Sequence, residues 1–404
     1  MKKLWRKVIR KIAPARAGIR PLRRYALREA NAIITVSEVT DRHGTGVILS
    51  RIFGESRNIL SIRSGNHYGE HSLGAAEVCV SQQGFNQRQS LARMSYALNG
   101  STICRVLCVP YLADELNSAL VLKEMFGAPL CTYVMDDNNV YSHGIPDELM
   151  REALSKSTLR LAISPEMREE YERKYGLKFW ILPPVVRAEA VPATLEMSRG
   201  GHFETRTAVM VGSLWSRQWL QQFRQTVRQA RVEVHWYGNA QFSHLGVTPE
   251  ELRQDGIVYC GFLPEAELTV RVKAYPYALI PSGTLDEQDD RPGIARLSLP
   301  TRLPHLLALT HTPMIVLGNS QTAAARFLER FGVGLVAPYD GVRLRQVVDQ
   351  ICRPEQQLAF RRRAAGHSAL FSAKGLAEWV WQSLAQGRPC DERFERAFTH
   401  DPGT

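Results

Sequence analysis

Two adjacent carboxylates follow a strongly apolar run in the first half of the chain. The run from Pro129 to Met135 reads PLCTYVM, and Asp136 and Asp137 come directly after it in the sequence DDNN. The run predicts a buried strand, and open α/β sheets bind ligands at the carboxyl ends of such strands. One of the two carboxylates could therefore take the proton of a substrate hydroxyl or orient that hydroxyl, with His143 as a further candidate. An Asp that caps a helix and a hydrated turn are the structural alternatives.

A glycine-rich turn lies earlier in the chain, after the first predicted strand. Its residues are His43, Gly44, Thr45 and Gly46, and a helix is predicted to follow. In a Rossmann-like half this is where backbone N–H groups approach an anionic ligand, so we expect a phosphate or the substrate that carries this hydroxyl to contact the turn. Gly44 and Gly46 would allow a positive-φ turn and a close approach. The alternative is an ordinary strand-to-helix turn.

Neither cysteines nor carboxylates predict a metal site. The seven cysteines include no CxxC pair and no histidine at ligand spacing. The pairs Asp136–Asp137 and Asp289–Asp290 lack the spacer of a metal-binding DxD motif. We therefore expect no metal and no cofactor, and reduced thiols in a cytosolic protein.

The positive charge of the chain is concentrated at its N-terminus. The 404 residues include 51 Lys or Arg and 40 Asp or Glu, a net charge of +11, and residues 1–30 alone hold eleven of the basic residues against Glu29. The rest of the chain is nearly neutral, with the composition of a globular protein. Nucleic-acid binding needs a basic folded face, so no nucleic-acid partner is expected.

Residues 1–13 are predicted to form a basic amphipathic helix. Lys and Arg fill one face, and apolar residues recur at helical spacing on the other: Leu4, Trp5, Val8, Ile9 and Ile12. Such a helix binds the interface of an anionic bilayer, so we expect peripheral attachment to a membrane surface through these residues. Docking on the protein's own surface and a floppy basic leader are the alternatives.

Short β-rich runs alternate with helical stretches over the rest of the chain. Strands are predicted at 31–38, 58–62, 103–109, 129–135, 159–164, 179–182, 208–211, 232–237, 257–259, 277–280, 314–317 and 334–336. Helices are predicted at 47–53, 113–126, 165–175, 218–230, 265–274, 304–310, 323–331 and 376–384. This alternation favours an α/β fold with parallel sheets covered by helices on both faces.

An irregular stretch with early prolines and a glycine pair separates two halves of similar size. The predicted organisation is a basic leader at 1–30, a Rossmann-like domain at 31–183, a linker at 184–207, a second Rossmann-like domain at 208–370, and a helix and tail at 371–404.

Six segments occur in a characteristic order between roughly residues 100 and 390. They are LAISPEMREEYERKYG with LPPVV, AVMVGSLWSRQWL, VEVHWYGN, GIVYCGFLPEAEL, YALIPSG and SLPTRLPHLLALTHTPMIVLG. In this order they resemble nucleotide-sugar glycosyltransferases of the GT-B architecture, especially the large retaining group of bacterial polysaccharide enzymes. The resemblance implies two Rossmann-like domains facing across a cleft, the first for the acceptor and the second for the donor nucleotide. It also implies a C-terminal helix that crosses back to the N-terminal domain.

The resemblance also implies a donor site in the second domain, formed by Gly212, Ser213, Arg217, Ser282, Thr301, Arg302 and His305. Departure of a nucleoside diphosphate from a sugar develops negative charge on the leaving phosphate, which Arg side chains and helix N-terminal amides stabilise. We expect Arg302 to hold the diphosphate and Thr301 to donate its hydroxyl. A capping Thr301 and a solvated Arg302 are the alternatives. His305 or Leu306 stands where many relatives carry a ribose-binding glutamate.

These features together predict a metal-independent, hexosyltransferase-like glycosyltransferase. It would move a sugar from a nucleotide-diphosphate donor to a lipid-linked or polysaccharide acceptor at the cytoplasmic face of the inner membrane. Arg302 and Asp136 or Asp137 would carry the catalysis. The alternatives are a catalytically silent protein of the same fold that binds a sugar nucleotide or a partner enzyme, and a nucleotide-sugar epimerase.

Overall fold

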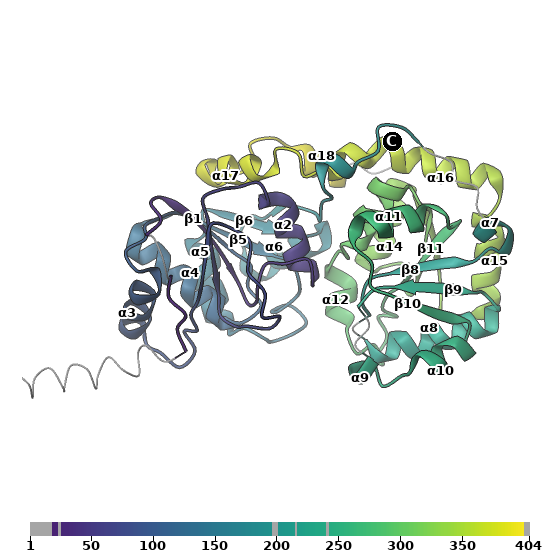
Figure 1. The fold of residues 1–404 in the computed structure, drawn as a ribbon, viewed down its shortest axis with the longest axis horizontal. Coiled ribbons are helices and arrows are strands. Elements are labelled where there is room, and N and C mark those ends of the chain that lie inside the picture. Colours follow the sequence, from purple (N-terminus) through teal and green to yellow (C-terminus); the bar gives the residue numbers. More distant parts are fainter. Residues whose placement is uncertain (1–17, 23–25, 196–200, 215, 240–241, 400–404) are drawn as a thin grey trace, which may run out of the picture. The chain divides into compact units, whose positions relative to one another are not determined.

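The chain forms two compact units, each built on its own sheet (Figure 1). The computed structural model describes residues 18–22, 26–195, 201–214, 216–239 and 242–399. Within this part, unit 1 comprises the residues up to Leu182 together with Gly375–Glu392, and unit 2 comprises Pro183–Lys374 and the residues from Arg393 on. The predicted amphipathic helix at 1–13 lies outside the described residues.

Unit 1 contains a parallel sheet with seven strands among the described residues. In spatial order the strands are β3 (Ala76–Cys79), β2 (Ile59–Arg63), β1 (Ala30–Thr35), β4 (Ile103–Cys108), β5 (Leu130–Val134), β6 (Leu159–Ala162) and β7 (Trp180–Ile181). Every residue of β2 and β5 is buried, as a sheet covered on both faces requires. The chain runs outward from β1 to β3 and then returns to β4 beside β1. β1 and β4 therefore form the switch point where such sheets bind ligands.

The helices of unit 1 lie between these strands in the chain, except for the last one, which belongs to the returning C-terminal segment. They are α2 (Gly44–Phe53), α3 (Gln87–Leu98), α4 (Ala113–Phe126), α5 (Asp147–Lys156), α6 (Pro165–Tyr175) and α17 (Leu376–Gln386). The predicted bounds of α4 and α6 are confirmed. α6 begins sharply because the Ser164 hydroxyl accepts the Met167 N–H at 2.9 Å and Pro165 has the φ of a first helical residue.

Unit 2 contains a parallel sheet with six strands among the described residues. In spatial order they are β10 (Ile257–Gly261), β9 (Val234–Tyr237), β8 (Ala208–Val211), β11 (Tyr277–Pro281), β12 (Met314–Leu317) and β13 (Gly334–Ala337). The order repeats the pattern of unit 1, and its switch point lies between β8 and β11. The Rossmann-like character predicted for both halves is confirmed.

The helices of unit 2 include several that the periodicity of the sequence did not predict. They are α7 (Gly201–Thr205), α8 (Arg217–Ala230), α9 (Phe242–Leu245), α10 (Pro249–Gln254), α11 (Glu265–Lys273), α12 (Pro292–Leu297), α13 (Arg302–His305), α14 (Ala323–Phe331), α15 (Gly341–Ile351), α16 (Pro354–His367) and α18 (Arg393–Thr399). The helix predicted at 304–310 begins earlier, at Arg302, and widens to a π-helical turn at Leu306–Thr310.

The C-terminal segment returns to unit 1, as predicted. α17 lies beside α2 (Figure 1), and the ring of Trp381 packs on Phe53 with centroids 5.2 Å apart. The chain then re-enters unit 2, where Phe398 of α18 packs edge-on against Phe331. None of the helices in the described part of the chain has both the length and the hydropathy needed to span a bilayer.

Candidate functional site

A chain of hydrogen bonds joins the first turn of α2 to the ends of β4 and β5 at the carboxyl edge of the unit 1 sheet. Thr45 follows β1, Tyr111 follows β4, and Asp136 follows β5. The Tyr111 hydroxyl donates to Oδ2 of Asp136 at 2.8 Å and lies 2.6 Å from the hydroxyl of Thr45. Burial and the neighbouring Asp136 raise the pKa of Tyr111 well above its usual value, so the phenol stays protonated and remains a donor. Two predicted residues, Thr45 and Asp136, are therefore brought together.

The neighbouring carboxylate of Asp137 has a different environment. It is buried, and its two oxygens accept the backbone N–H groups of four residues, at distances of 2.7 to 3.2 Å: Asn139, Val140, Tyr141 and Ser142. These donors fix the loop that leads from β5 to α5. Asp137 therefore acts as a buried anchor of this loop, which fits its contacts better than the hydrated turn does. Asp136, by contrast, is only half-buried. His143 lies in the same loop and is exposed.

The HGTG turn caps helix α2. Nδ1 of His43 accepts the Gly46 N–H at 3.3 Å, and Nε2 lies 2.9 Å from the carbonyl oxygen of Glu38. Because Nδ1 accepts, the neutral ring carries its proton on Nε2 and donates it to that carbonyl. Burial lowers the pKa of His43, which favours this neutral form.

The glycines of this turn correct one expectation. Gly44 and Gly46 belong to α2 and are not among the positive-φ residues of the described chain. Gly46 is required for a different reason, because a Cβ at this position would overlap the carbonyl oxygen of Thr40. Its N–H is already bonded to His43, so this amide is occupied by the helix cap.

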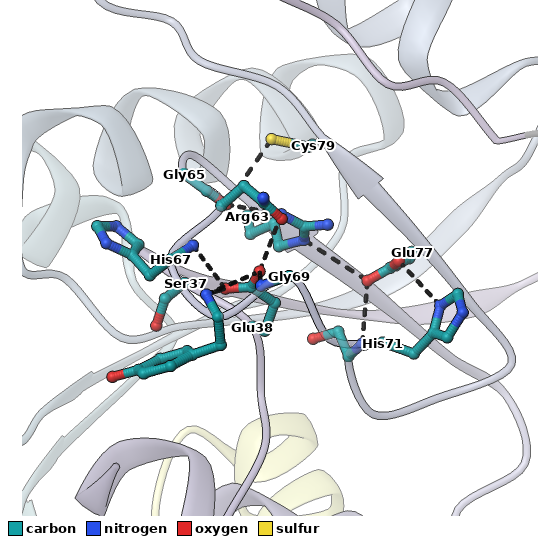
Figure 2. A network of polar contacts seen from close by, with 12 residues as sticks. Ser37, Glu38, Arg63, Gly65, His67, Gly69, His71, Glu77 and Cys79 are labelled. Atoms are coloured by element: carbon teal, nitrogen blue, oxygen red, sulfur yellow. Dashed lines mark hydrogen bonds and ion pairs between the residues drawn. The ribbon is translucent and has the colours of Figure 1, made fainter. Parts of the chain in front are cut away.

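A buried carboxylate holds the loop next to this turn. Figure 2 shows Glu38, which follows β1, surrounded by the loop between β2 and β3. Its carboxylate accepts the backbone N–H groups of His67 and Gly69 at 3.0 Å and that of Tyr68 at 3.3 Å. Arg63 lies 3.6 Å from the same carboxylate. Burial alone raises the pKa of Glu38, but the backbone donors outweigh it, and the net shift is downward.

In unit 2 a half-buried guanidinium lies at the switch point. Nη1 of Arg302 donates to the carbonyl oxygens of Val211 at 3.0 Å and Ser213 at 3.2 Å, both at the end of β8. Its Nε is buried and meets no hydrogen-bond partner among the described residues. Burial lowers the pKa of Arg302 to about 10, so the group stays charged at neutral pH.

The backbone around Arg302 is closely packed. Gly212 has a φ of +91°, and a Cβ on it would lie 3.6 Å from Nη1 of Arg302. A side chain at Gly238, after β9, would overlap the carbonyl oxygen of Gly212. Tyr339, after β13, donates its hydroxyl to the carbonyl oxygen of Ser282 at 2.8 Å and accepts the Ser282 N–H at 3.2 Å. The ends of β8, β11 and β13 and the start of α13 thus form one cluster.

The other residues predicted for the donor site differ in their contacts and burial. Ser213 contributes its carbonyl to Arg302, while its hydroxyl donates to the Asn239 carbonyl at 3.0 Å. Thr301 directly precedes α13 and forms no side-chain cap bond, so the capping alternative is wrong. Arg217 is exposed at the first position of α8. His305 is buried one turn beyond Arg302, with Nδ1 3.5 Å from the Glu265 carboxylate.

Two tyrosines of these clusters were not predicted. Tyr111 and Tyr339 each follow a strand in a Pro-Tyr pair, in Val109-Pro110-Tyr111 and in Ala337-Pro338-Tyr339. The repeated Pro-Tyr after an apolar run is the signal that could have identified them, because proline ends the strand and places the tyrosine at its carboxyl end. Glu38 had no such signal, since its role depends on a distant loop.

The described residues contain no cluster of metal-ligating side chains. No group of three His, Cys, Asp or Glu side chains in this part of the chain is close enough together to hold a metal ion.

Solved structures with the same fold are known, although the sequence matches no protein-family model and has no significant match among curated proteins. Anabaena HepE in complex with UDP is 13% identical, with a TM-score of 0.61 over 88% of this chain and 100% of HepE. WaaG, a glycosyltransferase involved in lipopolysaccharide biosynthesis, is 10% identical, with a TM-score of 0.58 over 88% of this chain and 99% of WaaG. A UDP-N-acetylglucosamine 2-epimerase is 10% identical, with a TM-score of 0.52 over 89% and 96% of the two chains.

The likeness extends over both units and over nearly the full length of these structures. The chain therefore has the fold of the GT-B glycosyltransferases, as the order of its sequence segments predicted.

Proposed function

We propose that the protein is a glycosyltransferase that transfers a hexose from a nucleoside-diphosphate donor to a saccharide or lipid-linked saccharide acceptor. The observation that carries this proposal is the Arg302 cluster at the switch point of unit 2. A buried Nε–H without a partner in the described residues costs free energy unless a ligand accepts it. A diphosphate oxygen is a suitable acceptor, and HepE, which has this fold, was solved with UDP.

Arg302 supplies the positive charge in the proposed reaction. The bond between the anomeric carbon and the diphosphate breaks, and its electron pair leaves with the nucleoside diphosphate. Arg302 stabilises the charge that develops on the leaving oxygen more strongly than the charge of the bound donor, which lowers the barrier. In this proposal Arg302 and backbone N–H groups stabilise the charge on the leaving diphosphate. Chelation of divalent metals therefore leaves turnover unchanged.

Asp136 serves the acceptor in the proposed reaction. It takes the proton of the acceptor hydroxyl, or orients that hydroxyl, while the hydroxyl oxygen forms the new bond to the anomeric carbon. We assign this role to Asp136 because both oxygens of Asp137 accept backbone donors. Tyr111 and Thr45 position the carboxylate.

We further propose that residues 1–13 attach the enzyme to the cytoplasmic face of an anionic membrane. The support is the pattern of the sequence, with basic residues opposite Leu4, Trp5 and Val8. The enzyme would bind a lipid-linked acceptor at this membrane surface.

A nucleotide-sugar epimerase is the second candidate, because UDP-N-acetylglucosamine 2-epimerase shares the fold. The two functions differ in what they need. An epimerase converts the nucleotide sugar without an acceptor, whereas a transferase releases the nucleoside diphosphate and lengthens a saccharide.

The test is a panel of UDP-, GDP- and ADP-sugars with and without bacterial lipid-linked saccharides. A transferase is stabilised against heat by one class of nucleotide sugar and releases its diphosphate faster when saccharide is added. A changed sugar that stays attached to the nucleotide identifies an epimerase. Binding without any turnover would leave only the catalytically silent alternative.

A further inference from the structure

An exposed aromatic ring is held against the HGTG turn, at the sheet edge that also carries the proposed acceptor carboxylate of Asp136. Tyr68 lies in the loop between β2 and β3 and is 41% exposed. Its ring stacks on His43, with centroids 5.4 Å apart and planes inclined by 9°. The His43 ring is itself fixed by bonds to the Glu38 carbonyl, the Gly46 N–H and the Ser37 hydroxyl. Stacking on this fixed His43 ring therefore holds the Tyr68 ring in its orientation.

The backbone that carries Tyr68 is fixed as well. Glu38 accepts the N–H groups of three successive residues of this loop, as Figure 2 shows for His67 and Gly69. From the other side, Nη1 of Arg63 donates at 2.8 Å to the Gly65 carbonyl and to the Asn66 side chain. Residues 67–69 at the loop tip are exposed, and their amides are nevertheless bound to the buried carboxylate of Glu38. The loop tip is therefore already ordered in the free protein, so a ligand that binds there does not have to offset the loss of its conformational entropy.

The position of the Tyr68 ring indicates which substrate contacts it. The loop follows β2, the HGTG turn follows β1, and Tyr111 and Asp136 follow β4 and β5. These four strands are consecutive in the sheet, so their carboxyl ends form one continuous edge. The nucleotide is assigned to Arg302 in unit 2, which leaves the acceptor as the occupant of this edge.

The chemistry of the platform fits a sugar ring. A pyranose has faces of C–H groups and a rim of hydroxyls, so it needs a flat apolar surface with polar groups around it. Tyr68 offers such a surface at low entropic cost. Polar groups beside it on the same loop and turn include His67 and the ion pair of Arg42 with Glu70, with N to O distances of 2.9 Å.

We propose that Tyr68, stacked on His43 and held by Glu38, is the platform on which a pyranose of the acceptor stacks. The proposal rests on the proposed glycosyltransferase function and adds that the acceptor is recognised through a saccharide ring rather than through a lipid chain alone.

The test compares two exposed tyrosines of unit 1. Tyr68→Ala removes the platform, and Tyr96→Ala removes a ring of similar exposure (38%) from α3. Glu38 holds the amide of residue 68 and not its ring, so the loop of Tyr68→Ala keeps its anchors. Tyr68→Phe keeps the ring. Each variant is applied to an array of bacterial hexose and amino-sugar oligosaccharides, and its affinity for UDP, GDP and ADP is measured in parallel.

We expect the wild type, Tyr68→Phe and Tyr96→Ala to retain the same saccharides, and Tyr68→Ala to bind them about tenfold more weakly, at unchanged nucleotide affinity. Equal retention by Tyr68→Ala, or no retention by the wild type, overturns the proposal. Loss of nucleotide affinity in Tyr68→Ala also overturns it, because the ring would then stack on the base. The proposed function fails separately, by the absence of nucleotide binding in every variant while saccharides are still retained.

Discussion

The two aspartates that follow β5 differ in what their oxygens contact, although they are adjacent in sequence. Asp137 faces backbone N–H groups of its own loop, and Asp136 faces the phenol of Tyr111. A carboxylate that accepts four backbone donors has little capacity for a substrate proton. The difference shows that Asp137 anchors the loop, and it supports the proposed catalytic role of Asp136.

Tyr111→Phe tests this assignment at a single atom. The variant removes the hydroxyl that positions Asp136 and keeps the ring, so we expect turnover to fall about tenfold or more, at unchanged nucleotide affinity. The measurements are kcat and the Kd for the nucleoside diphosphate. Tyr133→Phe is the matched control, because its buried hydroxyl donates at 2.6 Å to the Leu182 carbonyl and not to Asp136. Equal losses in the two variants would mean that Tyr111 has only a structural role.

At the scale of the element, helix α2 depends on the neutral form of His43. The pKa of a histidine is about 6.5 in an unfolded chain, and burial lowers the pKa of His43 below that value in the folded state. The unfolded chain therefore binds the proton more readily. The stability contributed by neutral His43 is complete above about pH 6.5 and is lost as the pH falls through the folded pKa.

His43→Asn isolates this contribution, because Asn also caps helices and does not titrate. Denaturant unfolding is measured for both proteins between pH 7 and pH 5. We expect the free energy of unfolding of the wild type to fall more steeply with acid than that of the variant. Parallel curves would contradict the role of a neutral His43.

The start of α2 also depends on the absence of a side chain at Gly46. In Gly46→Ala the new Cβ meets the backbone of Thr40, which cannot move aside as a flexible side chain can. We expect the free energy of unfolding to fall by about 2–4 kcal/mol. Gly366→Ala in α16 is the control, since no atom outside the local helix backbone lies within 4 Å of its Cβ. Helix propensity predicts a neutral or slightly stabilising effect there.

The elements that the sequence predicted well are those whose burial pattern is simple. Strands such as Met314–Leu317 are continuous apolar runs, and α6 has Ser and Pro at its start, so local chemistry determines their bounds. β3 and α3 were not predicted. Half of β3 is only partly buried, and α3 has a polar composition, so tertiary packing rather than periodicity defines them.

The candidate site was predictable only in part, for a related reason. Asp136 was identified because it directly follows an apolar run, and the HGTG turn because it lies between a predicted strand and a predicted helix. Their connection through Tyr111, and the clamp of Glu38 on residues 67–69, join positions that lie 25 to 66 residues apart. Contacts over such separations depend on the order of the strands, which the sequence pattern does not specify.

At the scale of the whole molecule, the basic N-terminal segment is predicted to determine where the protein binds in the cell. Deletion of residues 1–13 should abolish most binding to vesicles that contain anionic lipid, and binding of the full chain should weaken with salt, because charges are screened over about 8 Å at physiological ionic strength. Vesicle flotation with neutral lipid is the control. Undiminished flotation of the shortened chain with anionic vesicles would contradict the membrane assignment.

The most direct test of the whole account is the affinity for UDP, GDP and ADP, measured by calorimetry on the wild type, Arg302→Ala and Asp136→Asn. Arg343→Ala, which removes an exposed charge from α15 of the same unit, is the control. If Arg302 holds the diphosphate, Arg302→Ala weakens binding of the preferred nucleotide by about 10–100-fold. Asp136→Asn and Arg343→Ala bind it as the wild type does. Wild-type affinity in Arg302→Ala, or no binding of any of the three nucleotides by the wild type, would contradict the account.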